Sequence, residues 1–191
     1  LSLKTNQIIM KKCVLIFALA FLGTNAFAQD IDAIGKLYND KKYADAKTAI
    51  DKFLADTKNA NNADAWYFKG RIYNSLAAEA TTPKAQAFEY RLKAFEAYQN
   101  NQKYDAKDLR LKVDMWVPYL EIYAGLYDLG AAQFNDKDYE SSLNSFAKAL
   151  EVENFILAKK YEYSQIKLHA LDTALVLNAA VAATQSKKND E

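Results

Sequence analysis

Residues that interrupt a helix are scarce in this chain. Its 191 residues include only two prolines and five glycines, the two residue types least compatible with a helix interior. No stretch shows the sustained alternation of polar and apolar residues that is typical of a half-buried strand, whereas apolar residues at helical spacing occur in many places. The sequence therefore predicts an all-α protein.

Residues for metal or thiol chemistry are scarce as well. The single cysteine is Cys13 and the single histidine is His169, so a metal cluster of the usual Cys and His type is not expected. The glycine-rich motifs that cradle phosphates are missing from the sequence,. We expect neither a metal nor a cofactor.

Paired acidic residues make no better case for catalysis. Asp105 with Asp108, and Asp136 with Asp138, are close enough in sequence to act as general acid and base. They lie in polar stretches, where no apolar neighbourhood would raise the pKa of either carboxyl group. We expect that the protein is not an enzyme.

An excess of charge of one sign is also absent. The chain has 25 lysines and arginines against 24 aspartates and glutamates. Residues 1–28 hold three lysines and no acid, so 22 basic residues face 24 acidic ones in the remainder, a net charge of −2. This balance indicates neither nucleic acid nor an anionic membrane surface as a partner.

The N-terminal residues have the form of an export signal. The stretch "MKKCVLIFALAFLGTNAFAQD", which starts at Met10, has a basic beginning, a short apolar run and a small-x-small site at residues 26–28,. We expect residues 1–9 to be upstream sequence, residues 10–28 to be a signal peptide cut after Ala28, and residues 29–191 to be the exported domain, periplasmic or envelope-associated. The apolar run is too short to favour an uncleaved anchor. Cys13 stands too early for a lipoprotein signal, since Gln29 follows the expected cut.

One phrase occurs twice. Residues 38–54 read "YNDKKYADAKTAIDKFL" and residues 134–150 read "FNDKDYESSLNSFAKAL". In each copy a short polar turn precedes apolar residues at helical spacing, and another apolar helix is expected before the turn. Small residues, Ala46 and Ser142, occupy equivalent positions where the second helix must approach the first closely. The repeated unit is therefore predicted to be helix, tight turn, helix.

These units resemble the tetratricopeptide repeat (TPR), a helix pair of about 34 residues. The first-helix signature W-x-x-L-G-x-x-Y is matched within "WYFKGRIY" by Trp66, Gly70 and Tyr73. A third unit supplies Leu126, Leu129 and Gly130, then Tyr139, Ser142, Phe146 and Ala149. The first unit supplies Leu37, Tyr43, Ala46, Ile50 and Phe53, and the second helix of the second unit is looser, with Ala87, Ala94 and Phe95. The resemblance implies an α-solenoid over residues 29–191.

The chain departs from that family in length. Equivalent positions Trp66 and Leu126 lie 60 residues apart, so lengthened linkers are expected between and within the units. A fourth unit begins at "TALVLNAAVAATQSKKNDE" and offers a first helix only, giving about three and a half repeats. We expect that the array is truncated in a longer protein, the alternative being a capping helix. Pro118 either starts a helix near Val117 or kinks a longer one.

The resemblance also implies a binding surface, because first helices in this family line a concave groove that holds peptides or partner helices. The groove positions carried over from the family are Tyr38, Asn39, Tyr67, Arg71, Asn74, Tyr127, Phe134 and Asn135, with Leu177 and Gln185 in the partial fourth unit. Asparagine and arginine side chains there could bond a peptide backbone while tyrosines stack on its side chains. The alternative is that these side chains only line the solvated concave surface of the solenoid and bind no ligand. Arg71 is the single cation among them, so a clamp for a terminal carboxylate is not supported.

The expected function is therefore that of an exported scaffold that binds a protein or peptide in the bacterial envelope. Two alternatives stay open at this point. The chain is a structural repeat segment of a larger envelope protein whose functional domain lies elsewhere, or, with less support, it is an enzyme or carbohydrate-binding module on a helical scaffold. The identity of the partner does not follow from the sequence.

Overall fold

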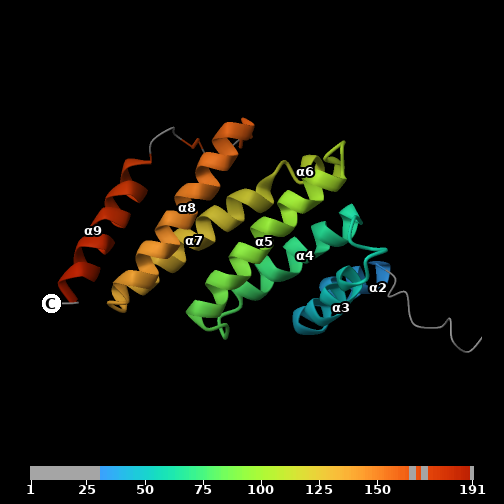
Figure 1. The fold of residues 1–191 in the computed structure, drawn as a ribbon, viewed down its shortest axis with the longest axis horizontal. Coiled ribbons are helices and arrows are strands. Elements are labelled where there is room, and N and C mark those ends of the chain that lie inside the picture. Colours follow the sequence, from blue (N-terminus) through green and yellow to red (C-terminus); the bar gives the residue numbers. More distant parts are fainter. Residues whose placement is uncertain (1–30, 164–166, 169–171, 190–191) are drawn as a thin grey trace, which may run out of the picture.

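A computed structural model describes residues 31–163, 167–168 and 172–189, and within these ranges the chain is all-helical, without strands (Figure 1). The prediction of an all-α protein is confirmed. The helices are α2 (Ile31–Asn39), α3 (Tyr43–Ala55), α4 (Ala63–Ala78), α5 (Lys84–Tyr104), α6 (Leu109–Val113), α7 (Val117–Asn135), α8 (Tyr139–Lys159) and α9 (Thr173–Asn189). The predictions for residues 1–28 and for His169 fall outside the described residues.

The long helices lie side by side in chain order, from α2 and α3 at one end of the molecule to α9 at the other (Figure 1). Each contacts the next, with the short α6 set between α5 and α7 in the chain. Contacts also join α2 with α4, α4 with α7, and α5 with α8. Helices α2, α4 and α7 therefore touch in turn, and they carry eight of the groove residues named above.

The repeated phrase folds in the same way in both copies. In the first, Lys41 has φ 58° and its N–H donates to the carbonyl of Tyr38, while Lys42 N–H donates to that of Leu37. In the second, Lys137 has φ 65°, and residues 137 and 138 repeat this pair of hydrogen bonds to residues 134 and 133. Both turns are Schellman motifs, in which a left-handed residue ends the first helix. The predicted unit of helix, tight turn and helix is confirmed at both places.

Small residues lie where the paired helices approach each other most closely. Ala46 and Ser142 are fully buried, and Ser142 Oγ donates to the carbonyl of Gly130 at 2.8 Å. A Cβ atom at Gly130 would lie 2.8 Å from the Phe146 ring, which is closer than carbon atoms pack. The close approach of α7 and α8 therefore requires small side chains at Gly130 and Ser142.

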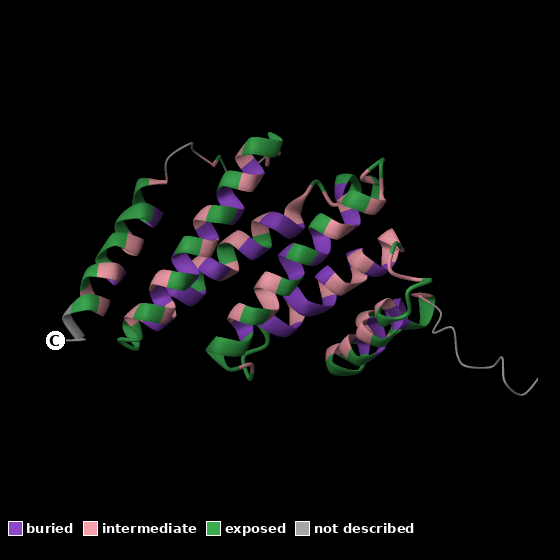
Figure 2. Cartoon of the chain, viewed as in Figure 1, coloured by how far each residue is buried: buried purple, intermediate pink, exposed green. Residues whose placement is uncertain are grey.

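The core runs along the row of helices, and Figure 2 shows the buried residues on the faces where helices pack. One cluster joins α2, α3 and α4 and includes Ile34, Ala46, Ile50 and Ile72, all fully buried. A larger cluster joins α4 to α9 and is rich in aromatic rings. Two of its fully buried tyrosines, Tyr98 and Tyr119, meet at 5.8 Å between ring centroids.

Part of the extra length that was expected in the linkers lies within helices α5 and α8. Helices α5 and α8 each have 21 residues against 13 in α3. The end of α5 is held because Asn101 is buried and its Nδ2 donates to the carbonyl of Ala63 at 2.9 Å. Pro118 lies in the first turn of α7, which begins at Val117, so it starts that helix and does not kink it. Proline fits there because first-turn N–H groups have no partner in the helix.

Helix α9 packs on α8 through Leu175 and Ala182, both fully buried. Its other side exposes apolar residues: Val176 is 38% exposed, Leu177 63% and Val181 39%. Figure 2 shows much of α9 as exposed. Within the described part of the chain, the helices lack the length and apolar character needed to span a membrane.

Candidate functional site

Eight of the residues predicted to line the groove come from α2, α4 and α7, and they differ in exposure. Asn39 and Asn135 are exposed, and four others are half-buried: Tyr38, Arg71, Tyr127 and Phe134. Tyr67 and Asn74 are buried, at 7% and 8% exposure. Tyr67 belongs to the larger core cluster, so its substitution would test folding more than binding.

A pocket of about 430 Å³ lies between α2, α4, α5 and α7 and contains three of the predicted residues, Tyr38, Arg71 and Asn74. We call it the polar pocket. Its remaining lining residues are Ser75, Ala78, Arg91, Glu121, Ala124, Gly125 and Asp128. The sequence did not point to Arg91, Glu121 or Asp128, which come from α5 and α7.

Arg71 holds one wall of the polar pocket together. Its Nε donates to Tyr38 Oη at 3.2 Å, and its Nη1 donates to Tyr67 Oη at 2.9 Å and lies 3.3 Å from Asp114 Oδ2. Tyr67 Oη also donates to Asp114 at 2.5 Å. Burial and this hydrogen bond raise the pKa of Tyr67 to about 12. Arg71 is thus committed to an internal ion pair that fixes α2, α4 and the turn after α6.

A second hydrogen-bond network joins α4, α5 and α7 on the opposite wall of the polar pocket. Asn74 Nδ2 donates to Glu121 Oε2 at 3.0 Å, and Arg91 Nη1 donates to Asn74 Oδ1 and to the carbonyl of Glu121. Burial lowers the pKa of Arg91, and the charges of Glu121 and Asp128 oppose that effect. Both the nitrogen and the oxygen of the Asn74 amide therefore have hydrogen-bond partners within the protein.

Gly125 makes this second network possible. A Cβ atom at position 125 would collide with the guanidinium of Arg91, so this group can occupy its place only because residue 125 is a glycine. The guanidinium of Arg91 is on a half-buried residue, whereas the carboxylates of Glu121 and Asp128 are on exposed residues of α7. The polar pocket therefore presents two acidic groups to solvent, while Arg71 is in an ion pair with Asp114 and Arg91 donates hydrogen bonds to Asn74 and to the carbonyl of Glu121.

A second, smaller pocket of about 250 Å³ lies between α7, α8 and α9. We call it the apolar pocket, and it is lined by Ala131, Phe134, Asn135, Phe146, Leu177, Asn178 and Val181. Tyr127 stands beside it, since its hydroxyl accepts a hydrogen bond from Asn178 at 3.0 Å and its ring meets that of Phe146. Predicted groove residues of α7 and α9 thus meet here, separately from those of α2 and α4.

Within the described ranges, His, Cys, Asp and Glu do not form a group of three or more that could hold a metal ion. Arg71 of the polar pocket is in an ion pair with Asp114, whereas Arg91 and Glu121 are hydrogen-bonded to the neutral amide of Asn74. The exposed carboxylates of the pocket suit recognition of a ligand by charge. Comparisons of the chain with protein-family models, curated proteins and solved structures found no match.

Proposed function

We propose that the protein is a TPR-like α-solenoid that acts as an exported scaffold in the bacterial envelope and binds a peptide or protein segment along the face formed by α2, α4, α7 and α9. The observation that carries this proposal is the polar pocket, because four helices converge there around three predicted groove residues. Export is proposed from residues 10–28 of the sequence, as argued above.

The exposed charges of the polar pocket favour a basic side chain in the ligand. Arg71 is in an ion pair with Asp114 at 3.3 Å, which leaves the half-buried Arg91 as one cation against the two carboxylates of Glu121 and Asp128. The two α7 carboxylates lie on exposed residues seven positions apart, two turns of one helix face,. A lysine or arginine side chain would complement these acids without displacing an internal ion pair.

The apolar pocket favours an apolar side chain nearby in the same ligand. On α7, the distance along the helix from Asp128 to the lining residues Ala131 and Asn135 is about 4.5 to 10 Å at 1.5 Å per residue. An extended peptide advances about 3.3 Å per residue. The basic and apolar residues of the ligand would therefore stand about one to three positions apart.

Selection from a library of random peptides by the purified protein tests this proposal. We expect enriched peptides to carry Lys or Arg one to three positions from Leu, Ile or Phe. The variant Ala124→Arg fills the polar pocket from an exposed position and should weaken the binding of a selected peptide by more than about tenfold, or 1.4 kcal/mol. The matched control Ala44→Arg, on an exposed position of α3 outside both pockets, should bind as the natural protein does. Unchanged binding by Ala124→Arg would count against the proposal.

A second candidate role, as a repeat segment within a larger envelope protein, is favoured by the exposed apolar residues of α9. Val176 lies outside the apolar pocket and is 38% exposed, so a photo-crosslinking group at position 176 would report what covers this side of the helix in the cell. A crosslink within the same polypeptide would favour the structural role. A crosslink to a separate protein would favour the scaffold.

A further inference from the structure

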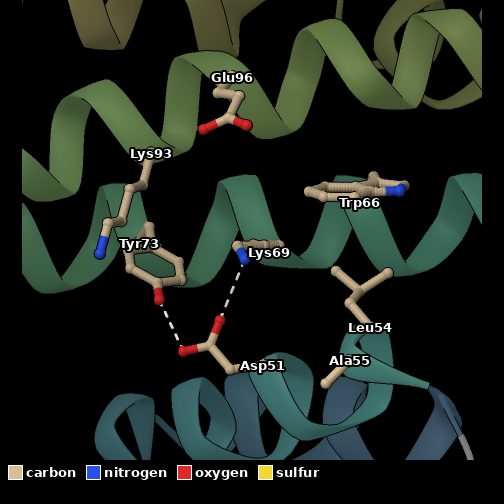
Figure 3. A pocket seen from close by; sticks show the side chains of 8 residues that line it. All are labelled: Asp51, Leu54, Ala55, Trp66, Lys69, Tyr73, Lys93 and Glu96. Carbon is tan, nitrogen blue, oxygen red and sulfur yellow. Dashed lines mark hydrogen bonds and ion pairs between the residues drawn. The ribbon is translucent and has the colours of Figure 1, made fainter. Parts of the chain in front are cut away.

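A third pocket, of about 430 Å³, lies on the opposite face of α4, between α3 and α5 (Figure 3). Its floor is formed by Trp66, Lys69 and Tyr73, which are spaced three and four residues apart and so share one face of the helix,. Its walls are Asp51, Leu54 and Ala55 of α3 and Lys93 and Glu96 of α5. The proposed peptide face lies on the other side of α4, so this pocket has no part in that proposal.

Positive charge gathers around the ring of Tyr73, which is 2% exposed. The ammonium groups of Lys47, Lys69 and Lys93 lie 5.5, 5.5 and 5.7 Å from its centroid. Such cation–π contacts offset only part of the hydration that each ammonium gives up near an aromatic ring. The ring is held in place because Tyr73 Oη donates to Asp51 Oδ2 at 2.7 Å (Figure 3).

Asp51 supplies the nearest negative charge, and it is already shared. Lys47 Nζ lies 3.1 Å from Asp51 Oδ2, and Lys69 Nζ lies 3.2 Å from Asp51 Oδ1. Burial would raise the pKa of Asp51, but hydrogen bonds from Tyr73 and the two lysines lower it overall, so this carboxyl group is ionised at neutral pH. The Asp51 carboxylate therefore forms ion pairs with two ammonium groups.

Lys93 is in no ion pair within the described part of the chain, and its ammonium group lies over the Tyr73 ring. Lys69 has three N–H donors, of which its contact with Asp51 uses one. Glu96, on the rim, is also without an ion pair among the described residues. The ammonium groups of Lys47, Lys69 and Lys93 exceed the carboxylates of Asp51 and Glu96 by one positive charge.

An apolar surface lies next to these cations. The indole of Trp66 is fixed because its Nε1 donates to the carbonyl of Ala60 at 2.7 Å, and Lys69 Nζ lies 5.3 Å from its ring. Leu54 and Ala55 form the wall nearest to this ring (Figure 3). We propose that this pocket binds an anionic group, a carboxylate or a phosphate, carried on an aromatic or apolar body, with Lys69 and Lys93 holding the anion and Trp66 contacting the body.

The indole N–H signal of Trp66 in the NMR spectrum of the isotope-labelled protein tests this, with the signal assigned by comparison with Trp116→Phe. The probes are benzoate and phenyl phosphate, with benzyl alcohol and benzylamine as neutral and cationic matches. We expect saturable shifts with the two anionic probes only, and the tighter of them identifies the anion. A saturable response to benzylamine of equal strength, or none to either anion, would overturn the proposal.

Two substitutions on exposed positions of α5 change the charge in opposite directions. Lys93→Gln removes a cation and should weaken the binding of the better anionic probe by about tenfold, the loss of one charge-assisted hydrogen bond. Glu96→Gln removes the opposing carboxylate and should strengthen it by about threefold, an effect that high salt should diminish. A role of these residues in folding alone would not give changes of opposite sign. Weaker binding in both variants, or unchanged binding in both, would contradict the assignment.

Discussion

Replacement of Gly70 by alanine tests how closely α4 and α5 pack. A Cβ atom at position 70 would lie 2.5 Å from Cε1 of Tyr98 and 2.7 Å from two further atoms of that ring. Real carbon atoms do not approach so closely. Because Tyr98 is fully buried, its ring can move only by displacing other core residues.

Two effects of this substitution oppose each other. Alanine is favoured over glycine in a helix interior by about 1 kcal/mol, whereas overpacking a core costs about 1–3 kcal/mol. The Tyr98 ring also meets the rings of Tyr67 and Tyr119, at 6.2 and 5.8 Å between centroids, so its displacement would disturb both. We therefore take the upper part of the overpacking range and expect Gly70→Ala to lower the free energy of unfolding by about 1–2 kcal/mol.

Urea denaturation followed by circular dichroism measures this change, and Gly35→Ala is its matched control. A Cβ atom at position 35 would lie 3.0 Å from Cζ of Phe68, a half-buried residue that has room to shift. The gain in helix propensity should therefore dominate, leaving this variant as stable as the natural protein or more stable by up to about 1 kcal/mol. A Gly70→Ala protein as stable as its Gly35→Ala counterpart would refute the packing argument.

Three further substitutions have expected effects on stability. Asn62→Ala removes the side chain that caps α4 by accepting from Ala65 N–H at 2.9 Å, and should cost about 1 kcal/mol in urea denaturation. Ser142→Ala removes a buried hydrogen bond to α7 and should cost about 0.5–1.5 kcal/mol by the same measurement. Glu153 is buried, and burial and the nearby Asp172 raise the pKa of its carboxyl group. Its ionisation therefore destabilises the fold increasingly as the pH rises above the ordinary glutamate value of about 4.3. Glu153→Gln should raise the melting temperature at pH 7 and lose that advantage below about pH 4, and a pH-independent difference would contradict this.

The local parts of the fold could be predicted because local sequence determines them. The polar turns at Lys41 and Lys137, and the small residues at Ala46 and Ser142, follow from helical spacing and from the repeated phrase alone. The prediction of lengthened linkers was only partly right, because part of the extra length lies within helices α5 and α8. The end of α5 continues as a helix because Asn101 is buried against α4, a contact that periodicity does not reveal.

The candidate site could be predicted only in part, for a similar reason. Tyr38 and Arg71 were identified from their register in the first helices, and they lie together in the polar pocket. Arg91 and Asp114 are far from them in sequence, and their roles depend on which helices become neighbours. The glycine at position 125, which leaves room for the Arg91 guanidinium, was the one local signal of that close approach.

The most direct test of the proposed function is to map a selected peptide on the protein by NMR. If the face formed by α2, α4, α7 and α9 binds the peptide, the backbone amide signals of Gly125 and Asp128 should shift most, together with those near Leu177. Signals of Ala55 and Lys93, on the opposite face of α4, should change little. Shifts confined to that opposite face, with Gly125 and Asp128 unaffected by a bound peptide, would contradict the account.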